Sequence, residues 1–305
     1  MEKKKKVFKE VSELVDDKTI LASNTSALSV SEMAKQAKDP SKVVGFHFFN
    51  PVHRMPLVEV IAAKQTSSDT IVSALALAKK LNKIPILVKD SSGFVVNRIL
   101  LHYINEAGYL LEETGDIEGI DRALEAFGMP MGPFRLSDEV GLDVGSKVLH
   151  ILQDTFGDRF ASPSIFEKVM AEKWLGKKSG KGFYLHGKSK HKNVNPQISQ
   201  MLSNTHFNLL NEEQAYKRLI YSMINEAACC LEDGIVQEAD AIDVGMIFGA
   251  GFPAFRGGLL RYADAIGLQA IINTLNEFSN RFNSNRFRPS TYLIKLAKKD
   301  KGFYS

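Results

Sequence analysis

A histidine and a glutamate twelve positions apart are the residues of this sequence best suited to move a proton. His47 stands near the end of a short apolar run, V-V-G-F-H-F, and Glu59 lies inside another, L-V-E-V-I-A. An unpaired buried carboxylate costs several kcal/mol or becomes neutral, so Glu59 needs a partner. If the two runs are neighbouring strands, the side chains meet as a histidine base oriented by an acid. A purely structural ion pair remains the alternative.

Three further polar clusters stand where ligands commonly bind. S-N-T-S (23–26) directly follows a predicted strand, and open α/β sheets place ligand groups at the carboxyl edge. Asn97 follows K-D-S-S-G-F-V-V, where strand-rich sequence gives way to helical sequence, and domain junctions favour ligand sites. K-K-S-G-K-G-F-Y (177–184) is a basic glycine turn suited to phosphate contact. The first cluster also reads as a helix cap and the last as a solvated turn.

The first ninety residues alternate between strand and helix patterns. Short β-rich runs predict strands over 19–23, 43–48, 57–62 and 84–89. Apolar residues at helical spacing predict helices over 2–15, 29–38 and 68–82. The first of these carries one apolar stripe, made of Val7, Phe8, Val11, Leu14 and Val15. The alternation indicates an α/β sheet, of which four strands are only part of a doubly wound domain.

From about residue 90 the pattern becomes helical and then repeats itself. I-N-E-A at 104–107 recurs at 224–227, an offset of 120, and the whole of 97–144 is echoed by 217–268. Such an echo indicates a duplicated domain. We therefore predict three domains, 1–89, 90–188 and 189–305, with a polar linker over 187–195. G-A-G-F-P-A (249–254) resembles a dinucleotide-binding loop but follows a helical segment, so we assign it to a turn of the repeat.

Composition narrows the class of protein. The 305 residues carry 39 basic and 35 acidic side chains, a balance that does not point to nucleic acid. The only cysteines, Cys229 and Cys230, are adjacent, which makes a structural disulfide within the chain improbable and fits a reducing compartment. No apolar run approaches the roughly 20 residues that span a bilayer. We expect a cytoplasmic or organelle-matrix protein, and the lysine-rich, uncapped first helix suggests that Met1 lies within a longer parent chain.

Several of these motifs, in their order and spacing, resemble the L-3-hydroxyacyl-CoA dehydrogenase family over essentially the whole chain. They are S-N-T-S-A-L, G-F-H-F-F-N-P-V, L-V-E-V-I, K-D-S-S-G-F-V-V-N-R, G-M-P-M-G-P-F-R-L-S-D-E-V-G-L-D and G-K-K-S-G-K-G-F-Y. The duplicated part, with R-Y-A-D-A-I-G-L and the terminal K-K-D-K-G-F-Y, looks most like the C-terminal portion of the multifunctional α-subunit of fatty-acid β-oxidation. The implied fold is part of a Rossmann-type NAD domain followed by two all-α C-terminal domains.

The resemblance also implies roles for particular residues. Those matched to catalysis and substrate orientation are His47, Glu59, Ser26 and Asn97. Those matched to cofactor binding are Asn24, Ser26, Asn50, Lys4 and Lys178. The implied reaction is NAD-dependent oxidation of a 3-hydroxyacyl-CoA to the 3-ketoacyl-CoA, and no metal is implied. The implied partners are a thiolase β-subunit and further copies of the chain.

One departure from the family pattern concerns the cofactor. The first βαβ half of the nucleotide domain, with its glycine loop and ribose-binding acid, is absent from this sequence. We therefore expect the chain alone to have very low activity. The alternative function is a helical dimerisation or assembly module, in which faces such as L-L-H-Y-I (100–104) meet a second subunit. Another NAD(P)-dependent hydroxyacid dehydrogenase is a weaker alternative, because those families lack this H-F-F-N-P and L-V-E-V spacing.

Overall fold

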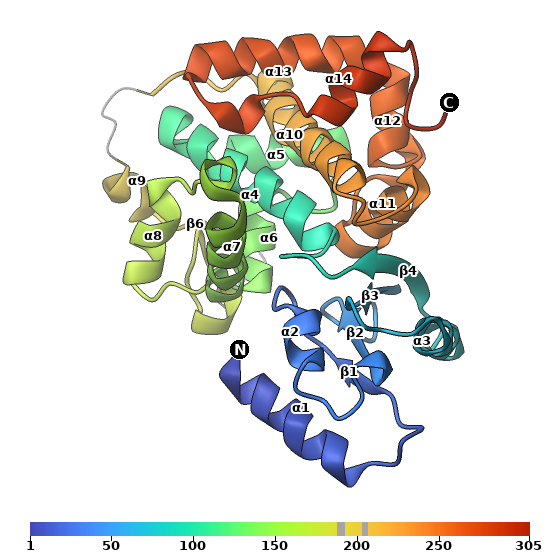
Figure 1. Cartoon of the computed structure of the whole chain (residues 1–305). Coiled ribbons are helices and arrows are strands. Elements are labelled where there is room, and N and C mark those ends of the chain that lie inside the picture. Colours follow the sequence, from blue (N-terminus) through green and yellow to red (C-terminus); the bar gives the residue numbers. More distant parts are fainter. Residues whose placement is uncertain (188–192, 203–206) are drawn as a thin grey trace. The chain divides into compact units, whose positions relative to one another are not determined.

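The computed structural model describes residues 1–187, 193–202 and 207–305 (Figure 1). The chain forms two compact units. One, here called the sheet unit, contains Met1–Arg98 and Cys230–Ala250. The other, the helical unit, contains Ile99–Cys229 and Gly251–Ser305. The three-domain division drawn from the sequence remains a prediction. The two compact units group residues that are close in space, whereas the three domains follow the order of the repeats along the chain.

A four-stranded sheet is the centre of the sheet unit. Its strands, in the spatial order β1-β2-β3-β4, are β1 (Leu21–Ser23), β2 (Val43–Phe48), β3 (Leu57–Ala62) and β4 (Ile84–Lys89). The pairs β1–β2 and β3–β4 are parallel and β2–β3 is antiparallel, so the sheet is mixed. All four predicted strands are confirmed, although β1 begins two residues later than the sequence pattern indicates.

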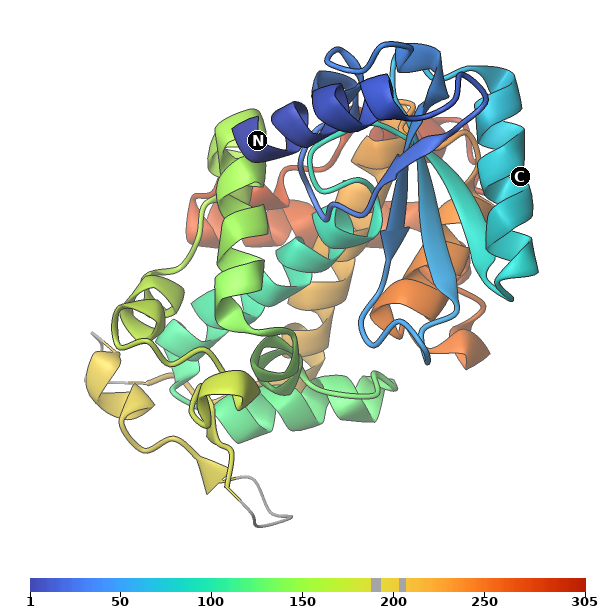
Figure 2. The same cartoon turned by 90° about the horizontal axis from the view of Figure 1, so that it is seen from below.

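Helices cover both faces of this sheet. The helical elements of the sheet unit are α1 (Glu2–Leu14), α2 (Val30–Ala34), η1 (Pro40–Lys42), α3 (Ser68–Lys80), α11 (Ala239–Gly245) and the π-helical turn η4 (Met246–Ala250). Figure 2 shows α3 running along one side of the strands. Alternate strand residues, Val44, Phe46, Val58 and Val60, pack on that side against Ala74 and Ala78. The intervening residues face the other side, because successive side chains of a strand point in opposite directions.

That second face of the sheet is covered by three segments of the sheet unit. A β-carbon on Gly45 of β2 would lie 2.9 Å from Val30 of α2, so α2 packs directly on the strand. On the same face, Gly249 of η4 approaches Leu57 of β3 and Val96 at the start of the next helix. His47 and Glu59 belong to this face by strand alternation. The face of the sheet that holds them is therefore covered by α2, η4 and the first residues of the helix that begins at Val96.

The apolar stripe of α1 is mostly exposed, apart from Phe8. Phe8 is 9% exposed, whereas Val7 is 53% exposed and Leu14 84% exposed. The helix packs against α2, and its buried residues are Phe8 and Ser12. Helical periodicity shows that the apolar residues share a side, but it cannot show how much of that side the rest of the chain covers.

Ten helices among the described residues build the helical unit, together with short 3₁₀ turns and one two-stranded ribbon. The helices are α4 (Val96–Thr114, whose first three residues belong to the sheet unit), α5 (Ile117–Phe127), α6 (Pro133–Val140), α7 (Leu142–Phe156), α8 (Ser164–Ala171), α9 (Ile198–Met201), α10 (Glu212–Glu232, whose last three residues belong to the sheet unit), α12 (Leu259–Ile266), α13 (Leu268–Phe282) and α14 (Thr291–Lys298). The turns are η2 (Gly157–Phe160), η3 (Lys177–Ser179), η5 (Ala254–Arg256) and η6 (Asn285–Phe287). The ribbon pairs β5 (Tyr184–Leu185) with β6 (Asn193–Val194).

The duplication is visible in matching contacts. Asp138 of α6 accepts hydrogen bonds from the backbone N–H groups of Phe183 (3.0 Å) and Tyr184 (2.9 Å). Asp264 of α12 accepts the equivalent bonds from Phe303 (2.8 Å) and Tyr304 (3.2 Å). A glycine precedes each Phe-Tyr pair because a β-carbon on Gly182 or Gly302 would lie 2.0 or 2.6 Å from the aspartate. The predicted duplicated helical architecture is thus confirmed.

The two repeats also exchange buried charges. Glu106 of the first repeat is 2% exposed and accepts from Nε of Arg218 (2.8 Å) and Nε of Arg286 (2.9 Å), both from the second repeat. Glu226 of the second repeat lies 3.5 Å from Nη2 of Arg159 of the first. Each buried glutamate therefore takes an arginine from the other copy. Breaking such a pair is costly, because the remaining charge is left in a poorly solvated site.

One expectation about surfaces is wrong. The L-L-H-Y-I face proposed to meet a second subunit is largely buried within the chain. His102 is 6% exposed, with its ring 4.2 Å from that of Phe160, and Tyr103 is fully buried. The predicted polar linker is structured at its end, since Asn195 is 1% exposed and donates to the carbonyl of Gly182 at 2.9 Å. Residues 188–192 of that linker lie outside the described part of the chain.

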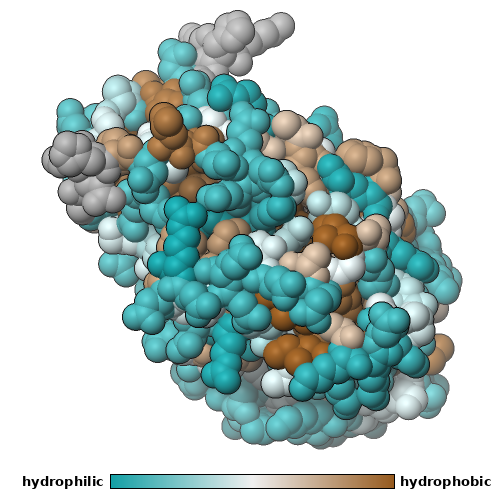
Figure 3. Space-filling view, turned by 90° about the horizontal axis from the view of Figure 1, so that it is seen from above, coloured by the Kyte–Doolittle hydropathy of each residue, from teal (hydrophilic) through white to brown (hydrophobic). Residues whose placement is uncertain are grey.

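The surface is mostly polar. Figure 3 shows a face on which hydrophilic side chains predominate and apolar side chains gather in several separate patches. Scattered apolar side chains are normal on folded proteins. No helix among the described residues is long and apolar enough to cross a bilayer.

Candidate functional site in the sheet unit

His47 and Glu59 meet on the second face of the sheet. They are directly opposite each other in the antiparallel pair β2–β3, so their side chains point to the same side. Nδ1 of His47 lies 2.8 Å from Oε2 of Glu59, and the residues are 4% and 0% exposed. The pairing expected from two adjacent apolar strands is therefore present. A carboxylate oxygen accepts, so Nδ1 carries the proton and the free lone pair of the neutral ring belongs to Nε2.

The second oxygen of Glu59 is held by backbone groups. Oε1 accepts from the N–H of Val95 at 3.1 Å and from the N–H of Val96 at 3.0 Å. Val96 is the first residue of α4, so these donors belong to the group of amides that a helix leaves without an intrahelical partner. They carry partial positive charge and favour an anion. Three donors thus hold the buried carboxylate.

Aromatic rings enclose the imidazole on its buried side. The ring of Phe49 lies 4.6 Å from that of His47, and the ring of Phe94 lies 5.8 Å away. Within the described residues, Nε2 has no hydrogen-bond partner, unlike Nδ1. The ring is therefore fixed at one nitrogen while the other stays available.

The S-N-T-S segment and Asn97 lie on neighbouring elements of the same unit. Ser23 ends β1, and the side chain of Asn24 accepts from the backbone N–H of Phe48 at the end of β2 (3.2 Å). The side-chain amide of Asn97 donates to the backbone carbonyl of Ser26 at 3.0 Å. The carboxyl ends of the parallel strands β1 and β2 lie at one edge of the sheet, which is where ligands bind in open α/β sheets. This edge collects the polar groups predicted from the sequence.

Lys4 reaches the same edge from α1. Its Nζ lies 3.4 Å from Oγ of Ser23 and 3.4 Å from the carbonyl oxygen of Asn24. Partial burial lowers the pKa of the Lys4 ammonium from its usual value, because the charged form loses hydration. The long contacts leave ammonium protons for a further acceptor.

Two further predicted residues are exposed. Asn50 lies just after β2 with its side chain exposed. Lys178 belongs to the helical unit, where it is exposed and forms an ion pair with Asp143, whose pKa is lowered chiefly by that hydrogen bond. The basic turn at 177–184 is thus occupied by contacts within its own unit, with Lys177 bonded to Glu139 at 2.8 Å.

Sequence reasoning missed the groups that hold Glu59. The donors are backbone amides, which every non-proline residue carries, so no residue type marks them. The one available signal was S-S-G-F before a helix, because a glycine there permits a sharp turn. In the structure Gly93 and Phe94 have φ of 70° and 51°, and that turn aims the amides at the carboxylate.

Comparison with known proteins gives these residues a context. Residues 1–91 match the model of the 3-hydroxyacyl-CoA dehydrogenase NAD binding domain. Residues 93–186 and again 215–302 match the model of the 3-hydroxyacyl-CoA dehydrogenase C-terminal domain. The chain belongs to the 3-hydroxyacyl-CoA dehydrogenase family. The repeated match also accounts for the echo between the two halves of the helical sequence.

Its relatives include subunits of multifunctional complexes. The chain is 43% identical over 303 residues to a fatty acid oxidation complex subunit alpha from Shewanella amazonensis, covering 99% of this chain and 43% of the relative. A subunit of the same name from Vibrio parahaemolyticus is 44% identical over 286 residues, 94% of this chain and 40% of the relative. This dehydrogenase-family chain thus spans less than half the length of these curated relatives.

Solved structures with the same fold are also similar over nearly the whole chain. The structure of 3-hydroxybutyryl-CoA dehydrogenase from Escherichia coli K12 matches with a TM-score of 0.85 and 25% identity, covering 98% of this chain and 79% of that one. The dehydrogenase part of multifunctional enzyme 1 from C. elegans matches with a TM-score of 0.66 and 28% identity, covering 96% and 68%. The fold assigned to this family member is a Rossmann-like domain followed by helical C-terminal domains.

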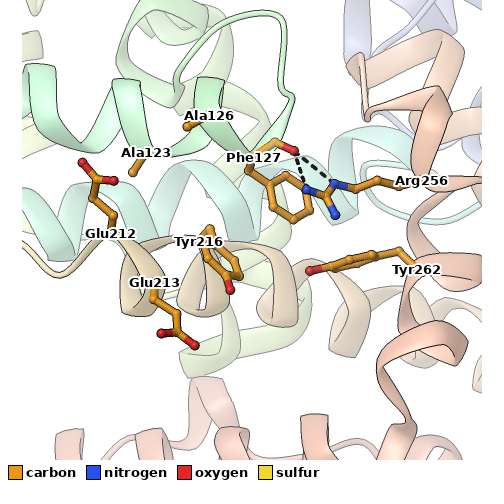
Figure 4. Close-up of a pocket in the computed structure, with 8 residues that line it drawn as sticks. All are labelled: Ala123, Ala126, Phe127, Glu212, Glu213, Tyr216, Arg256 and Tyr262. Atoms are coloured by element: carbon orange, nitrogen blue, oxygen red, sulfur yellow. Dashed lines mark hydrogen bonds between the residues drawn. The ribbon is translucent and has the colours of Figure 1, made fainter.

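A hollow of about 540 Å³ lies in the helical unit of this family member (Figure 4). Its lining residues come from α5, α10, η5 and α12, and are Ala123, Ala126, Phe127, Glu212, Glu213, Tyr216, Arg256 and Tyr262. Nε and Nη2 of Arg256 donate to the carbonyl of Phe127 at 3.0 and 2.9 Å, and the guanidinium lies 4.0 Å from the Phe127 ring centre. Burial raises the pKa of the Tyr262 hydroxyl. Arg256 thus caps the C-terminal end of α5, whose last carbonyls lack helical partners.

Replacing Arg256 with leucine should lower the free energy of unfolding by about 1.5–3 kcal/mol, the usual value of a charged hydrogen-bonding group. The loss arises because the Phe127 carbonyl and the negative end of α5 lose their cation. Urea unfolding followed by circular dichroism measures it. Arg122→Leu is the matched control, because its guanidinium is exposed and lies 4.0 Å from the exposed Glu212. Its removal should lower the free energy of unfolding by at most about 1 kcal/mol. Equal costs for the two variants would contradict the capping role.

Among the described residues, no group of histidine, cysteine, aspartate or glutamate side chains is arranged to hold a metal ion.

Proposed function

We propose that this chain is the dehydrogenase portion of a fatty acid oxidation α-subunit and that it interconverts 3-hydroxyacyl-CoA and 3-ketoacyl-CoA. The observation that carries the proposal is the 2.8 Å contact between Nδ1 of His47 and Oε2 of Glu59, which leaves Nε2 available. A histidine fixed at one nitrogen by a carboxylate is suited to general-base catalysis at the other. Family membership supplies the reaction class to which this pair is matched.

In the proposed oxidation, Nε2 of His47 takes the proton of the substrate's 3-hydroxyl group. NAD, when bound, accepts the hydride that leaves C3. The C–O bond becomes a carbonyl, so the two electrons leave with the hydride and the proton stays on the imidazole. Glu59 then stabilises the imidazolium, because a carboxylate at 2.8 Å favours the charged ring. In the reverse direction the imidazolium returns the proton to the developing alkoxide.

The remaining site residues receive binding roles in this proposal. Asn97 and Ser26, already joined through the Ser26 carbonyl, orient the substrate and the nicotinamide end of the cofactor. Asn24 and Lys4 provide polar contacts at the carboxyl edge of β1. The other two residues matched to cofactor binding are Asn50 and Lys178. For Lys178 this role requires the exposed ammonium to exchange its ion pair with Asp143 for the ligand.

The residues present fit one end of NAD better than the other. Hydroxyl, amide and ammonium groups at the edge of β1 and β2 suit a nicotinamide ribose. No glycine-rich turn follows any described strand, and the G-A-G-F-P-A segment follows α11 and begins within η4. The pyrophosphate normally sits on such a turn at a helix N-terminus. We therefore expect weak cofactor binding by this chain alone.

Adding the glycine-rich turn should restore the cofactor. We expect a chain extended N-terminally through that turn to bind NAD at micromolar concentration and to reduce acetoacetyl-CoA, whereas this chain binds it at least about 100-fold more weakly, a difference of roughly 2.7 kcal/mol. Calorimetry measures binding, and loss of NADH absorbance measures turnover.

His47→Gln in the extended chain is the control that separates binding from chemistry, since it should bind NAD and fail to turn over. Turnover by this chain at the rate of the extended one would contradict the expected dependence on the turn. No turnover by either chain would contradict the proposed enzyme and favour the assembly function. The same proposal includes three further points. A thiolase partner is tested by co-purification, and self-association of the chain is tested by ultracentrifugation. The three-domain division is tested by limited proteolysis.

A further inference from the structure

The segment that leads into α4 is built in an unusual way beside the histidine. Phe94 has φ of 51°, a left-handed conformation that non-glycine residues seldom adopt, and its side chain is completely buried. Gly93 before it is also left-handed, with φ of 70°. Such a conformation costs of order 1–3 kcal/mol and persists only where the surroundings enforce it. Something in this segment therefore holds Phe94 against its own preference.

What the turn achieves is the direction of two amides. Immediately after Phe94, the N–H groups of Val95 and Val96 both reach Oε1 of Glu59, at 3.1 and 3.0 Å. Glu59 is fully buried and has its other oxygen on His47. The carboxylate is thus fixed between one ring nitrogen and two backbone donors, and it cannot rotate without losing all three.

The ring of Phe94 is the anchor of this arrangement. It lies 5.8 Å from the imidazole, so the same residue contacts the histidine and sets the backbone that holds the histidine's partner. The turn is also closed by two backbone bonds, from Phe94 N–H to the Ser91 carbonyl (3.0 Å) and from Arg98 N–H to the Gly93 carbonyl (3.1 Å). Burial of a large aromatic ring is the contribution that offsets the strained φ.

We infer that Phe94 is a positioning residue: its buried ring fixes the left-handed turn that aims the Val95 and Val96 amides at Glu59, and through Glu59 it fixes the orientation of His47. The inference rests on the proposed function for its effect on catalysis, although the geometric part does not need it. Phe94 touches no substrate in this scheme. It acts through Glu59, so its removal should affect the catalytic step more than substrate binding.

The first test uses this chain as it is and needs no cofactor. In Phe94→Ala, the Nδ1–H proton of His47, assigned by its loss in His47→Gln, should lose its downfield position in a nitrogen-edited NMR spectrum, and the Val95 and Val96 amides should exchange faster with solvent. Phe46→Ala is the matched control, because Phe46 is also a buried phenylalanine but packs on α3, on the opposite face of the sheet. It should leave these signals unchanged. Unchanged signals in Phe94→Ala, or equal changes in both variants, would overturn the inference.

A second pair of variants removes one donor directly. Proline is accepted at the first position of a helix and has no N–H, so Val96→Pro deletes one bond to Glu59. Val96→Ala keeps the amide and removes comparable packing. The His47 signal should change in the proline variant alone. A change of the same size in the alanine variant would show that packing, rather than the amide, holds the pair.

Kinetics then test the consequence in the extended chain that turns over. A small displacement of the catalytic group costs roughly 10- to 100-fold in rate, so Phe94→Ala should lower kcat by that factor with KM for acetoacetyl-CoA changed less than about twofold. Phe94→Leu, which restores most of the volume, should recover part of kcat. A loss expressed in KM alone would contradict positioning. Absence of turnover in the unaltered extended chain would refute the proposed function. The NMR experiment would still test whether Phe94 positions Glu59 and His47, because it needs no turnover.

Discussion

Replacing His47 with glutamine should lower kcat for the reduction of acetoacetyl-CoA by roughly 10²–10⁴-fold, the usual contribution of a positioned general acid or base. The amide cannot take up or return a proton, whereas its size lets the strand pair β2–β3 persist. KM should change little, because in the proposed scheme His47 acts on the reacting hydroxyl rather than on the CoA. Steady-state kinetics of the extended chain at saturating NADH give both constants.

The matched control is His53→Gln. His53 is exposed and follows the same strand by a few residues, and the site does not use it. Its replacement should leave kcat within about twofold of the parent, as expected for a surface change. If both variants lose activity equally, the loss comes from the loop after β2 and the assignment of the base to His47 is wrong.

The largest effect on stability is expected from Arg218→Met. This arginine is 2% exposed and forms ion pairs with both Glu106, which is equally buried, and Glu113. Its Nη1 lies 2.8 Å from Oε2 of Glu113. Its removal leaves Arg286 as the remaining cationic partner of Glu106. The buried carboxylate then loses part of the positive charge that compensates it in a poorly solvated site. Breaking one partner of a buried ion pair costs about 3–5 kcal/mol, which corresponds to a fall in Tm of roughly 10 °C for a unit of this size.

Two further variants make this prediction specific. Lys217→Met removes the neighbouring cation, whose partner Glu213 is exposed, and should cost at most about 1 kcal/mol. The double variant Arg218→Met with Glu106→Gln should recover part of the loss, because it removes the stranded charge as well. Thermal unfolding followed by circular dichroism decides among them. A single Arg218→Met variant no less stable than Lys217→Met would show that the buried pair contributes little.

The parts of the fold that could be predicted from the sequence are those that follow from the periodic spacing of apolar side chains or from a repeated motif. The apolar runs around His47 and Glu59 gave both strands with their bounds and the expectation that the two side chains meet, because a period of two assigns each residue to a face. The repeat of I-N-E-A gave the duplication before any contact was known. The roles of Ser26, Asn97 and the other matched residues remain predictions that the experiments above address.

The parts that could not be predicted depend on backbone direction or on distant partners. The amides of Val95 and Val96 carry no signature in the sequence, since what distinguishes them is the turn at Phe94. Arg218 looks like an ordinary surface residue of an amphipathic helix, and only the fold shows that it lies in the interior. The exposure of the α1 stripe could not be predicted either, because helical periodicity does not show which neighbours cover a face.

The exchange of arginines between the two repeats has a consequence for how the helical part can be divided. Arg218 and Arg286 neutralise Glu106 from the second copy, while Arg159 approaches Glu226 from the first. A chain cut between the copies would therefore leave an uncompensated interior charge in each product. We therefore expect the two copies to unfold together although they arose by duplication, so that proteolytic cleavage between them should destabilise both.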